Sequence, residues 1–280
     1  MMEDLDPKIL KKLYVPLPDS HKGQNGKLLL ISGSKLFHSS SLWALKVASR
    51  IVDMVFYSSV DENNEIVKEA KKEFRDGIVV PRSKVEEYVQ EADCILIGSG
   101  LPRKEGKEKG DDDTKILTET LLKKYPKKKW VLDGGSLQTI NPEIIPPNSI
   151  ITPHSREFKT LFGMEASKES IEAMSKKYTI VIVTKGPTDI VCPPFDSAQG
   201  KTRCVRVSGG NAGMTKGGTG DVLAALIASF YCKNEAFLSA CAGSYINKKA
   251  GESLYKKMGY YFNSSDLADE IPKIMKNLLT

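Results

Sequence analysis

The chain has 280 residues, of which 40% are hydrophobic and 27% are charged. This balance excludes a disordered or fibrous protein, and the length is sufficient for a substantial hydrophobic core. The formal charge of +6, from 41 basic and 35 acidic residues, is mild, and the lysines fall in short runs such as residues 123–129. The sequence therefore lacks the clustered basic and aromatic pattern that is typical of a nucleic-acid-binding protein.

The first ten residues, MMEDLDPKIL, carry acidic side chains and lack the basic and apolar regions of a secretory signal. The longest mainly apolar stretch, residues 222–232, is far shorter than the roughly 20 residues that cross a bilayer. We therefore expect a cytoplasmic protein with no membrane partner.

Neither the cysteines nor the histidines show a metal-binding or disulfide pattern. The cysteines are odd in number and include no C-x-x-C pair, so we expect no disulfide framework. They are Cys94, Cys192, Cys204, Cys232 and Cys241. The three histidines, His21, His38 and His154, are scattered, so we expect no structural zinc site.

Seven short runs of apolar or β-branched residues, each bounded by turn residues, predict buried strands. They occupy residues 28–32, 54–59, 77–80, 93–98, 130–133, 149–152 and 179–186. Apolar residues at helical spacing lie between several of these runs, within residues 42–52, 116–121 and 158–162. Alternating strands and helices favour an α/β fold with a mainly parallel sheet and helices on both faces.

The pattern changes after Gly186. Residues 188–193 and 203–208, separated by the loop 194–202, predict a β-hairpin or an antiparallel edge. From Val222 onward the pattern is nearly all helical. No internal repeat, low-complexity tract or long linker marks a second domain, so we expect a single domain over residues 1–280.

Three glycine-rich turns follow predicted strands, and open α/β sheets bind ligands outside the carboxyl ends of their strands. The turn Gly98-Ser99-Gly100 starts like a dinucleotide-binding fingerprint, but Arg103 stands where the third glycine belongs, and a plain turn is an equal alternative. The turn Lys185-Gly186 closes another strand and is not specific.

The third turn, GGNAGMTKGGTGD at residues 209–221, is more informative. Six glycines lead directly into an apolar helix, so bare backbone N–H groups can converge at the positive helix end and form an anion hole. No Gly-Lys-Ser/Thr ends the run, which excludes a Walker A loop. Asp221 is either a helix N-cap or a base that takes a proton from a substrate hydroxyl during phosphoryl transfer.

The run GNAGMTKGGTGDVL resembles the signature of the ADP/ATP-dependent NAD(P)H-hydrate dehydratases, a family of the ribokinase-like superfamily. Six further segments agree with the family in the same order, so the resemblance covers nearly the whole chain. They are HKGQNGKLLLISGS at 21–34, GSGL at 98–101, VLDGGSL at 131–137, ITPHSREFKTLFG at 151–163, VIVTKG at 181–186 and SSDLADEIP at 264–272. The resemblance implies a ribokinase-like three-layer α/β sandwich.

The resemblance also implies a repair reaction, catalysed by a lyase. NADH or NADPH that has been hydrated at its dihydropyridine ring is phosphorylated at the new hydroxyl by ADP or ATP with Mg²⁺. Phosphate is a much better leaving group than hydroxide, so its departure regenerates the reduced cofactor. The family further implies a homo-oligomer, and we expect no fused epimerase domain of the kind that some relatives carry.

Individual residues acquire roles by their positions in the family motifs. Asp221 would be the catalytic base, beside an anion hole formed by Gly217, Gly218, Thr219 and Gly220. The hydrated cofactor would contact Ser40, Gly100, His154 and Asp221, although a lone histidine such as His154 is more often structural. The nucleotide would contact Lys185, Gly186, Pro187, Thr188, Asp189, Asn211, Gly217 and Gly220.

The chain departs from the family pattern at three places. Ser39-Ser40-Ser41 replaces Gly-Ala-Ala, Val52-Asp53-Met54 replaces Gly-Ala-Gly, and Asp133-Gly134-Gly135 replaces Asp-Ala-Asp. The loop 194–202 also looks longer than is typical. Two other functions stay open, a ribokinase-like kinase of a small vitamin precursor and a nucleotide-sensing binding protein without catalysis.

Overall fold

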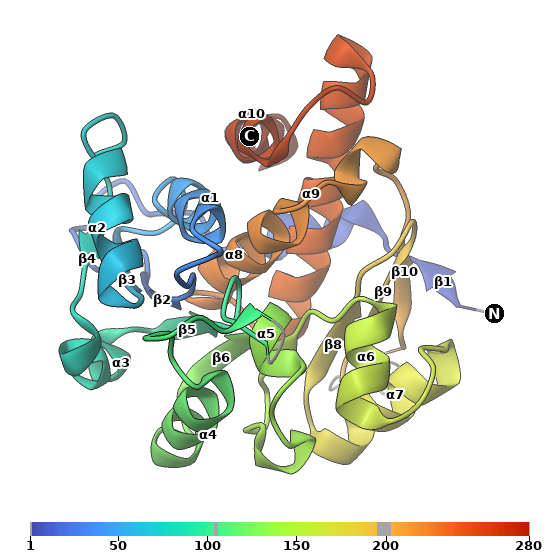
Figure 1. Cartoon of the computed structure of the whole chain (residues 1–280). Coiled ribbons are helices and arrows are strands. Elements are labelled where there is room, and N and C mark those ends of the chain that lie inside the picture. Colours follow the sequence, from blue (N-terminus) through green and yellow to red (C-terminus); the bar gives the residue numbers. More distant parts are fainter. Residues whose placement is uncertain (1, 104–105, 195–202, 280) are drawn as a thin grey trace.

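The computed structural model describes residues 2–103, 106–194 and 203–279, and within them ten strands form one sheet (Figure 1). The strand order is β1-β10-β9-β8-β7-β6-β5-β2-β3-β4. The strands are β1 Glu3–Asp4, β2 Lys27–Ile31, β3 Met54–Ser58, β4 Ile78–Val79, β5 Cys94–Ile97, β6 Lys129–Leu132, β7 Ile150–Ile151, β8 Val181–Thr184, β9 Asp189–Cys192 and β10 Val205–Val207.

The α-helices between and after the strands range from four residues in α5 to 23 residues in α9. They are α1 Ser39–Ala48, α2 Asp61–Ala70, α3 Val85–Glu91, α4 Thr114–Lys124, α5 Gly134–Leu137, α6 Ser155–Phe162, α7 Lys168–Tyr178, α8 Thr219–Tyr231, α9 Ala236–Met258 and α10 Ser264–Leu279. The helical face expected up to Val52 is shorter than predicted, because α1 ends at Ala48 and the chain continues in a turn.

Strand pairing confirms the mainly parallel sheet. Only β9 runs antiparallel to its neighbours β8 and β10, which confirms the predicted hairpin, and every other pair in the described sheet is parallel. The loop predicted at 194–202 lies, from residue 195 on, outside the described residues. Strand β1, at the edge beyond β10, was not predicted, because a two-residue strand carries no periodic pattern.

Alternate residues of each strand point to opposite faces of the sheet, and both faces are buried. In β2, Leu28 and Leu30 belong to one core, whereas Leu29 and Ile31 belong to the other. Helices α1, α8, α9 and α10 cover the first core, and α3 to α7 cover the second, as the layers above and below the sheet in Figure 1 show. The fold is the expected three-layer α/β sandwich.

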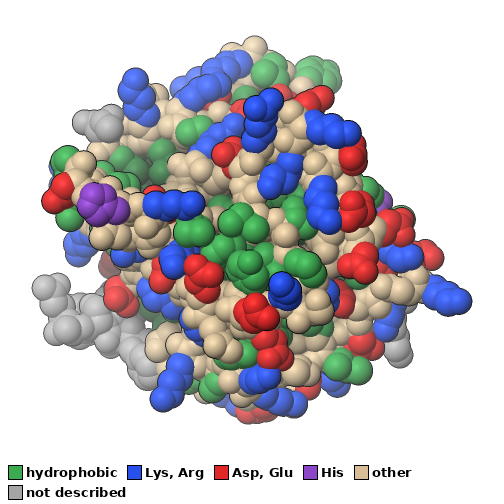
Figure 2. Space-filling model, turned by 90° about the vertical axis from the view of Figure 1, so that its left-hand side faces the viewer, with side chains coloured by type: hydrophobic (Ala, Val, Ile, Leu, Met, Phe, Trp, Pro, Cys, Tyr) green, Lys and Arg blue, Asp and Glu red, His purple; other side chains and the backbone are tan. Residues whose placement is uncertain are grey.

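The most apolar helix, α8, packs on β5 and β6 and is flanked by α1 and α9, which pack on neighbouring strands of the same face. The apolar stretch at residues 222–232 belongs almost entirely to this helix, and its side chains are buried in the hydrophobic core. None of the helices in the described part of the chain is long and apolar enough to cross a membrane. On the face seen from the left of Figure 1, basic and acidic side chains are interspersed around a small hydrophobic patch (Figure 2).

We expected no disulfide framework, but Cys192 and Cys204 form a disulfide that the sequence pattern did not indicate. The hairpin register pairs Val191 with Val205 and therefore sets Cys192 directly opposite Cys204, with a Cα–Cα distance of 4.2 Å. Both residues are buried. Counting cysteines could not reveal this pair, because the register of two antiparallel strands decides which residues face each other. Cys94, Cys232 and Cys241 are free and buried.

We predict that reducing the disulfide lowers the free energy of unfolding by about 3 kcal/mol, because the bridge closes a short loop between residues 12 apart in sequence and restricts the unfolded chain. Urea unfolding with and without a reductant measures this difference. The double variant Cys192→Ala, Cys204→Ala is the control, since its stability should not respond to the reductant. An equal stability of the reduced and oxidised wild type would contradict the prediction.

Candidate active site

The carboxyl ends of five parallel strands, β2, β5, β6, β7 and β8, meet at one edge of the sheet. The chain leaves β2 toward β3 on one side, while β5 lies on its other side, so this edge contains a topological switch point, where such sheets bind ligands. A hollow of about 410 Å³ opens there. Its lining residues are Leu36, Phe37, His38, Ser39, Ser40, Trp43, Gly100, Leu101, Arg103, Gly134, Gly135, Gln138, Glu157, Gly217, Gly218 and Asp221.

The glycine run ends at this hollow as predicted. Gly218 is the N-cap of α8, has a φ of +93°, and offers no side chain to the helix. In the first turn of α8, Thr219 N donates a long hydrogen bond of 3.4 Å to the Lys216 carbonyl, whereas the N–H groups of Gly220 and Asp221 have no partner among the described residues and lie at the positive end of the helix dipole. Gly218 also admits the Trp43 ring, because a Cβ atom there would lie 2.1 Å from Trp43 Cζ3. A Cβ atom at Gly217 would meet nothing within 4 Å.

Four charged side chains form a cluster beside the hollow, which we call the acid cluster: Asp133, Glu157, Lys185 and Asp221. Of these, Glu157 and Asp221 line the hollow itself. Lys185 Nζ lies 2.7 Å from Asp133 Oδ1 and 3.7 Å from Glu157 Oε2. Asp133 also accepts hydrogen bonds from Ser99 Oγ at 3.1 Å and Thr152 Oγ1 at 2.7 Å. The cluster thus joins the ends of β5, β6, β7 and β8 with the starts of α6 and α8.

Charge repulsion and burial perturb the groups of the acid cluster. Burial, together with the negative charge of Asp133, raises the pKa of Asp221 to about 7, although the positive charge of Lys185 opposes this. Burial also raises the pKa of Glu157. Burial alone would lower the pKa of Lys185, but the carboxylates of Asp133 and Glu157 hold it well above its ordinary value. Lys185 is therefore a permanent cation, and Asp221 can gain or lose a proton near neutral pH.

His154 lies at the same edge of the sheet but does not line the hollow. It is the N-cap of α6, where its Nδ1 accepts hydrogen bonds from the backbone of Arg156 at 3.1 Å and Glu157 at 3.2 Å. Its backbone N–H in turn donates to Glu157 Oε2 at 2.9 Å, which completes a capping box. About half of the imidazole is exposed. His154 therefore has a structural role as the cap of α6, and the exposed half of its imidazole ring remains accessible to a ligand.

Ser40 and Gly100 pack against each other in the wall of the hollow. A Cβ atom at Gly100 would lie 2.0 Å from Ser40 Oγ, so glycine is needed for this packing as well as for its φ of +68°. Ser40 Oγ makes only long contacts, 3.4 Å to the Phe37 carbonyl and 3.5 Å to the Ser99 carbonyl. Its hydroxyl can therefore turn to a ligand at small cost.

The residues from Gly186 to Asp189, predicted to bind nucleotide, form the tight turn between β8 and β9. Asp189 Oδ1 accepts a hydrogen bond from Gly186 N at 3.0 Å, and its Oδ2 accepts one from Ser244 Oγ at 2.6 Å. Lys248 on α9 pairs with Asp189 at 3.2 Å and donates to the carbonyls of Gly186 and Pro187. The Asp189 carboxylate is therefore committed to shaping this turn.

Two further predicted residues have structural partners. Asn211 caps the 3₁₀ turn at Ala212–Thr215 by accepting from Gly213 N at 2.9 Å, and its Nδ2 donates to the Gly251 carbonyl at 2.8 Å. Thr219 Oγ1 donates to the Met214 carbonyl at 2.7 Å. Both side chains hold the glycine run in shape, which leaves backbone groups as the donors at its end.

The sequence did not indicate several residues of the hollow. Trp43, Phe37 and Gln138 come from segments whose patterns predict only helix or loop. The position of Glu157 could have been noticed in the sequence. It lies in the first turn of α6, which begins shortly after the buried strand β7, and helices that follow parallel strands begin at the edge where such sheets bind ligands.

Comparison with known proteins identifies what this geometry resembles. The model of the NAD(P)H-hydrate dehydratase family matches residues 28–273. A bifunctional NAD(P)H-hydrate repair enzyme of Methanocaldococcus jannaschii is 38% identical over 95% of this chain and 51% of its own length. An ADP-dependent (S)-NAD(P)H-hydrate dehydratase of Nitrosopumilus maritimus is 32% identical over 95% of both chains. The chain thus spans about half the length of the bifunctional relatives.

Solved structures support the fold. The ADP/ATP-dependent NAD(P)H-hydrate dehydratase of Bacillus subtilis, co-crystallised with ATP and Mg²⁺, superposes with a TM-score of 0.79 at 20% identity and covers 99% of both chains. Ribokinase of Thermotoga maritima superposes with a TM-score of 0.55 at 12% identity, over 90% of this chain and 100% of its own. The three-layer sandwich is therefore ribokinase-like.

We predict that Asp133→Asn lowers the pKa of Asp221 by about one unit or more, because it removes a neighbouring negative charge and releases Lys185 to pair with Asp221. The carboxyl carbon resonance of Asp221, followed by NMR across pH, measures the shift. Asp19→Asn, at an exposed position, is the control and should leave the titration unchanged. If the Asp221 titration in Asp133→Asn matched that of wild type, the proposed repulsion would be absent.

Proposed function

This chain is a member of the NAD(P)H-hydrate dehydratase family, and from that premise we propose that it regenerates NADH and NADPH from their hydrated forms, using ADP or ATP as phosphoryl donor. The observation that carries the proposal is the position of Asp221. Its carboxyl group stands in the first turn of α8, beside free N–H donors and on the wall of a hollow, with a pKa of about 7. Such a group can accept a proton at neutral pH while the helix end stabilises an anion.

The reaction we infer has two stages. Asp221 accepts the proton of the ring hydroxyl as the hydroxyl oxygen bonds to the terminal phosphorus of the nucleotide and the bond to the leaving nucleotide breaks. The N–H groups of Gly218, Thr219 and Gly220 stabilise negative charge on the transferred phosphoryl group. Phosphate then leaves with its bonding electrons, and water accepts the proton that the adjacent ring carbon loses, which restores the double bond of the dihydropyridine.

The residues present fit a magnesium ion that arrives with the nucleotide. No group of three or more histidine, cysteine or acidic side chains in the described residues forms a metal site by itself. Mg²⁺ commonly binds one or two carboxylates together with substrate phosphates, and Glu157, which lines the hollow, would supply one here. When bound, the ion would neutralise charge that builds on the transferred phosphoryl group.

The remaining parts of the proposal concern the setting of the enzyme. We expect it to act in the cytoplasm on small molecules, and the family match does not favour the kinase alternative. We also propose a homo-oligomer, which is supported by exposed aromatic side chains near the end of α9, where Tyr261 is 91% exposed. Light scattering of the purified protein measures its oligomeric state.

We predict that Asp221→Asn abolishes dehydration while nucleotide still binds. The amide keeps the size of the side chain but cannot accept the hydroxyl proton, so the rate should fall at least about 100-fold. Recovery of dihydronicotinamide absorbance from hydrated NADH measures turnover, and calorimetry measures nucleotide binding. Asp61→Asn, also in the first turn of a helix but away from the site, is the matched control. Near-normal turnover of Asp221→Asn would refute the assigned base.

His154 should contact the hydrated cofactor as well as cap α6, and two variants separate these roles. His154→Ala removes both, whereas His154→Asn keeps a capping side chain. We predict that both variants raise the KM for hydrated NADH, by about tenfold for one lost hydrogen bond. Only His154→Ala should lose stability, by about 1 kcal/mol. If His154→Asn had the wild-type KM, the capping role would be sufficient to explain the residue.

A further inference from the structure

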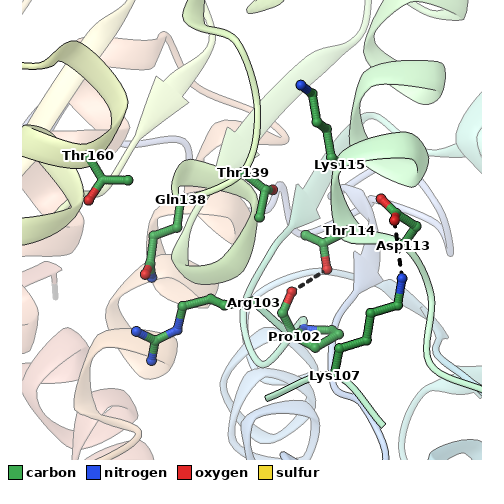
Figure 3. A pocket seen from close by; sticks show the side chains of 9 residues that line it. All are labelled: Pro102, Arg103, Lys107, Asp113, Thr114, Lys115, Gln138, Thr139 and Thr160. Carbon is green, nitrogen blue, oxygen red and sulfur yellow. Dashed lines mark hydrogen bonds and ion pairs between the residues drawn. The ribbon is translucent and has the colours of Figure 1, made fainter. Parts of the chain in front are cut away.

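A second and larger cavity adjoins the hollow that contains Asp221. Its volume is about 670 Å³, and it is lined by Pro102, Arg103, Lys107, Asp113, Thr114, Lys115, Gln138, Thr139 and Thr160 (Figure 3). Arg103 and Gln138 line both spaces, so a ligand can extend from one to the other. We call this second space the basic cavity.

The basic cavity carries an excess of positive charge. Lys107 lies 3.1 Å from Asp113, and Lys115 lies 4.0 Å from Glu119, at the limit of an ion pair. Arg103 makes no ion pair with any residue that the structure describes. Figure 3 shows its side chain extending toward Gln138, with Lys107 turned to Asp113 instead. The guanidinium at the junction of the two spaces is thus available to an anion.

The walls of the basic cavity are held in place by internal hydrogen bonds. Thr114 Oγ1 donates to the Pro102 carbonyl at 2.6 Å, and Thr139 Oγ1 donates to the Gly135 carbonyl at 3.0 Å. Gln138 Nε2 donates to Glu157 Oε1 at 3.1 Å, which ties the shared wall to the acid cluster. The cavity is therefore preformed, as ligand sites usually are.

We propose that the basic cavity binds the adenosine phosphate half of the hydrated dinucleotide, with Arg103 as its main phosphate contact; this inference rests on the proposed function. The hollow of about 410 Å³ holds the reacting ring beside Asp221, and the remaining half of a dinucleotide needs further space and cations. A guanidinium suits phosphate because it offers several N–H donors in a planar fork. The turn Lys185–Asp189, assigned to the donor nucleotide, does not line the basic cavity.

The experiment compares substrates and variants in steady-state kinetics. Arg103→Gln should raise the KM for hydrated NADH and hydrated NADPH about tenfold, with kcat and the KM for ADP or ATP unchanged. Lys115→Gln should raise the same KM values less. Lys123→Gln is its matched control, because Lys123 also pairs with Glu119 from α4, at 3.2 Å, but does not line the cavity.

The decisive substrate is hydrated reduced nicotinamide mononucleotide, which lacks the adenosine phosphate half. The wild-type KM for it should be higher than for the dinucleotide, and Arg103→Gln should change it less than about twofold. An equal effect of Arg103→Gln on both substrates, or an effect on the KM for ADP or ATP, would overturn the proposal. If the wild-type protein regenerated no dihydronicotinamide with either nucleotide, the proposed function itself would fail. If the wild type were active and Arg103→Gln had the same KM values, only the proposed role of the basic cavity in binding the adenosine phosphate half would be refuted.

Discussion

The site depends on the ion pair between Lys185 and Asp133, which joins the end of β8 to the end of β6 across β7. Removing one member of a buried pair leaves an uncompensated charge and typically costs about 3 to 5 kcal/mol. The single ammonium of Lys185 faces three carboxylates, those of Asp133, Glu157 and Asp221. Burial raises the pKa values of Glu157 and Asp221, and the charge of Asp133 raises them further because one cation cannot neutralise three anions. The same excess of negative charge is compatible with the proposed binding of a cation together with a nucleotide, and Asp221 stands as a proton acceptor of near-neutral pKa for the hydroxyl of the proposed reaction.

The layered fold could be predicted because its strands are buried on both faces and therefore read as uninterrupted apolar runs, as in LLLI at the core of β2. Short elements could not be predicted in this way. β1 has two residues, and α5, at Gly134–Leu137, has only four and begins with two glycines. The disulfide between Cys192 and Cys204 was missed for a related reason, because it depends on the register between two strands, and a register cannot be read from either strand alone.

The place where the glycine run meets the hollow could be predicted, because a run of glycines before an apolar helix leaves backbone N–H groups uncovered at the start of that helix. Side chains that reach the site from distant segments could not. Trp43 packs against Gly218 from α1, and only the packing of α1 on α8 brings them together. Lys248 is a buried lysine of α9 that pairs with Asp189, and its helix pattern gives no hint of this. His154 shows the limit of a motif, which located the residue correctly at the ligand edge but could not reveal that its Nδ1 caps α6.

The three serines at residues 39–41 show how a departure from the family pattern can be accommodated. A buried hydroxyl in place of alanine requires a hydrogen-bond partner, or it destabilises the fold. Ser41 Oγ accepts from Tyr57 Oη at 2.8 Å and from Asn63 Nδ2 at 3.1 Å, so its hydroxyl is satisfied beneath the start of α1. Burial raises the pKa of Tyr57 to about 12, which keeps the phenol protonated as that donor. Ser40, one residue earlier, lies in the wall of the hollow and has only the two long contacts. The two neighbouring serines therefore have different roles. Ser41 stabilises the start of α1 through short hydrogen bonds, whereas the Ser40 hydroxyl lacks a short internal hydrogen bond and stays available to a ligand.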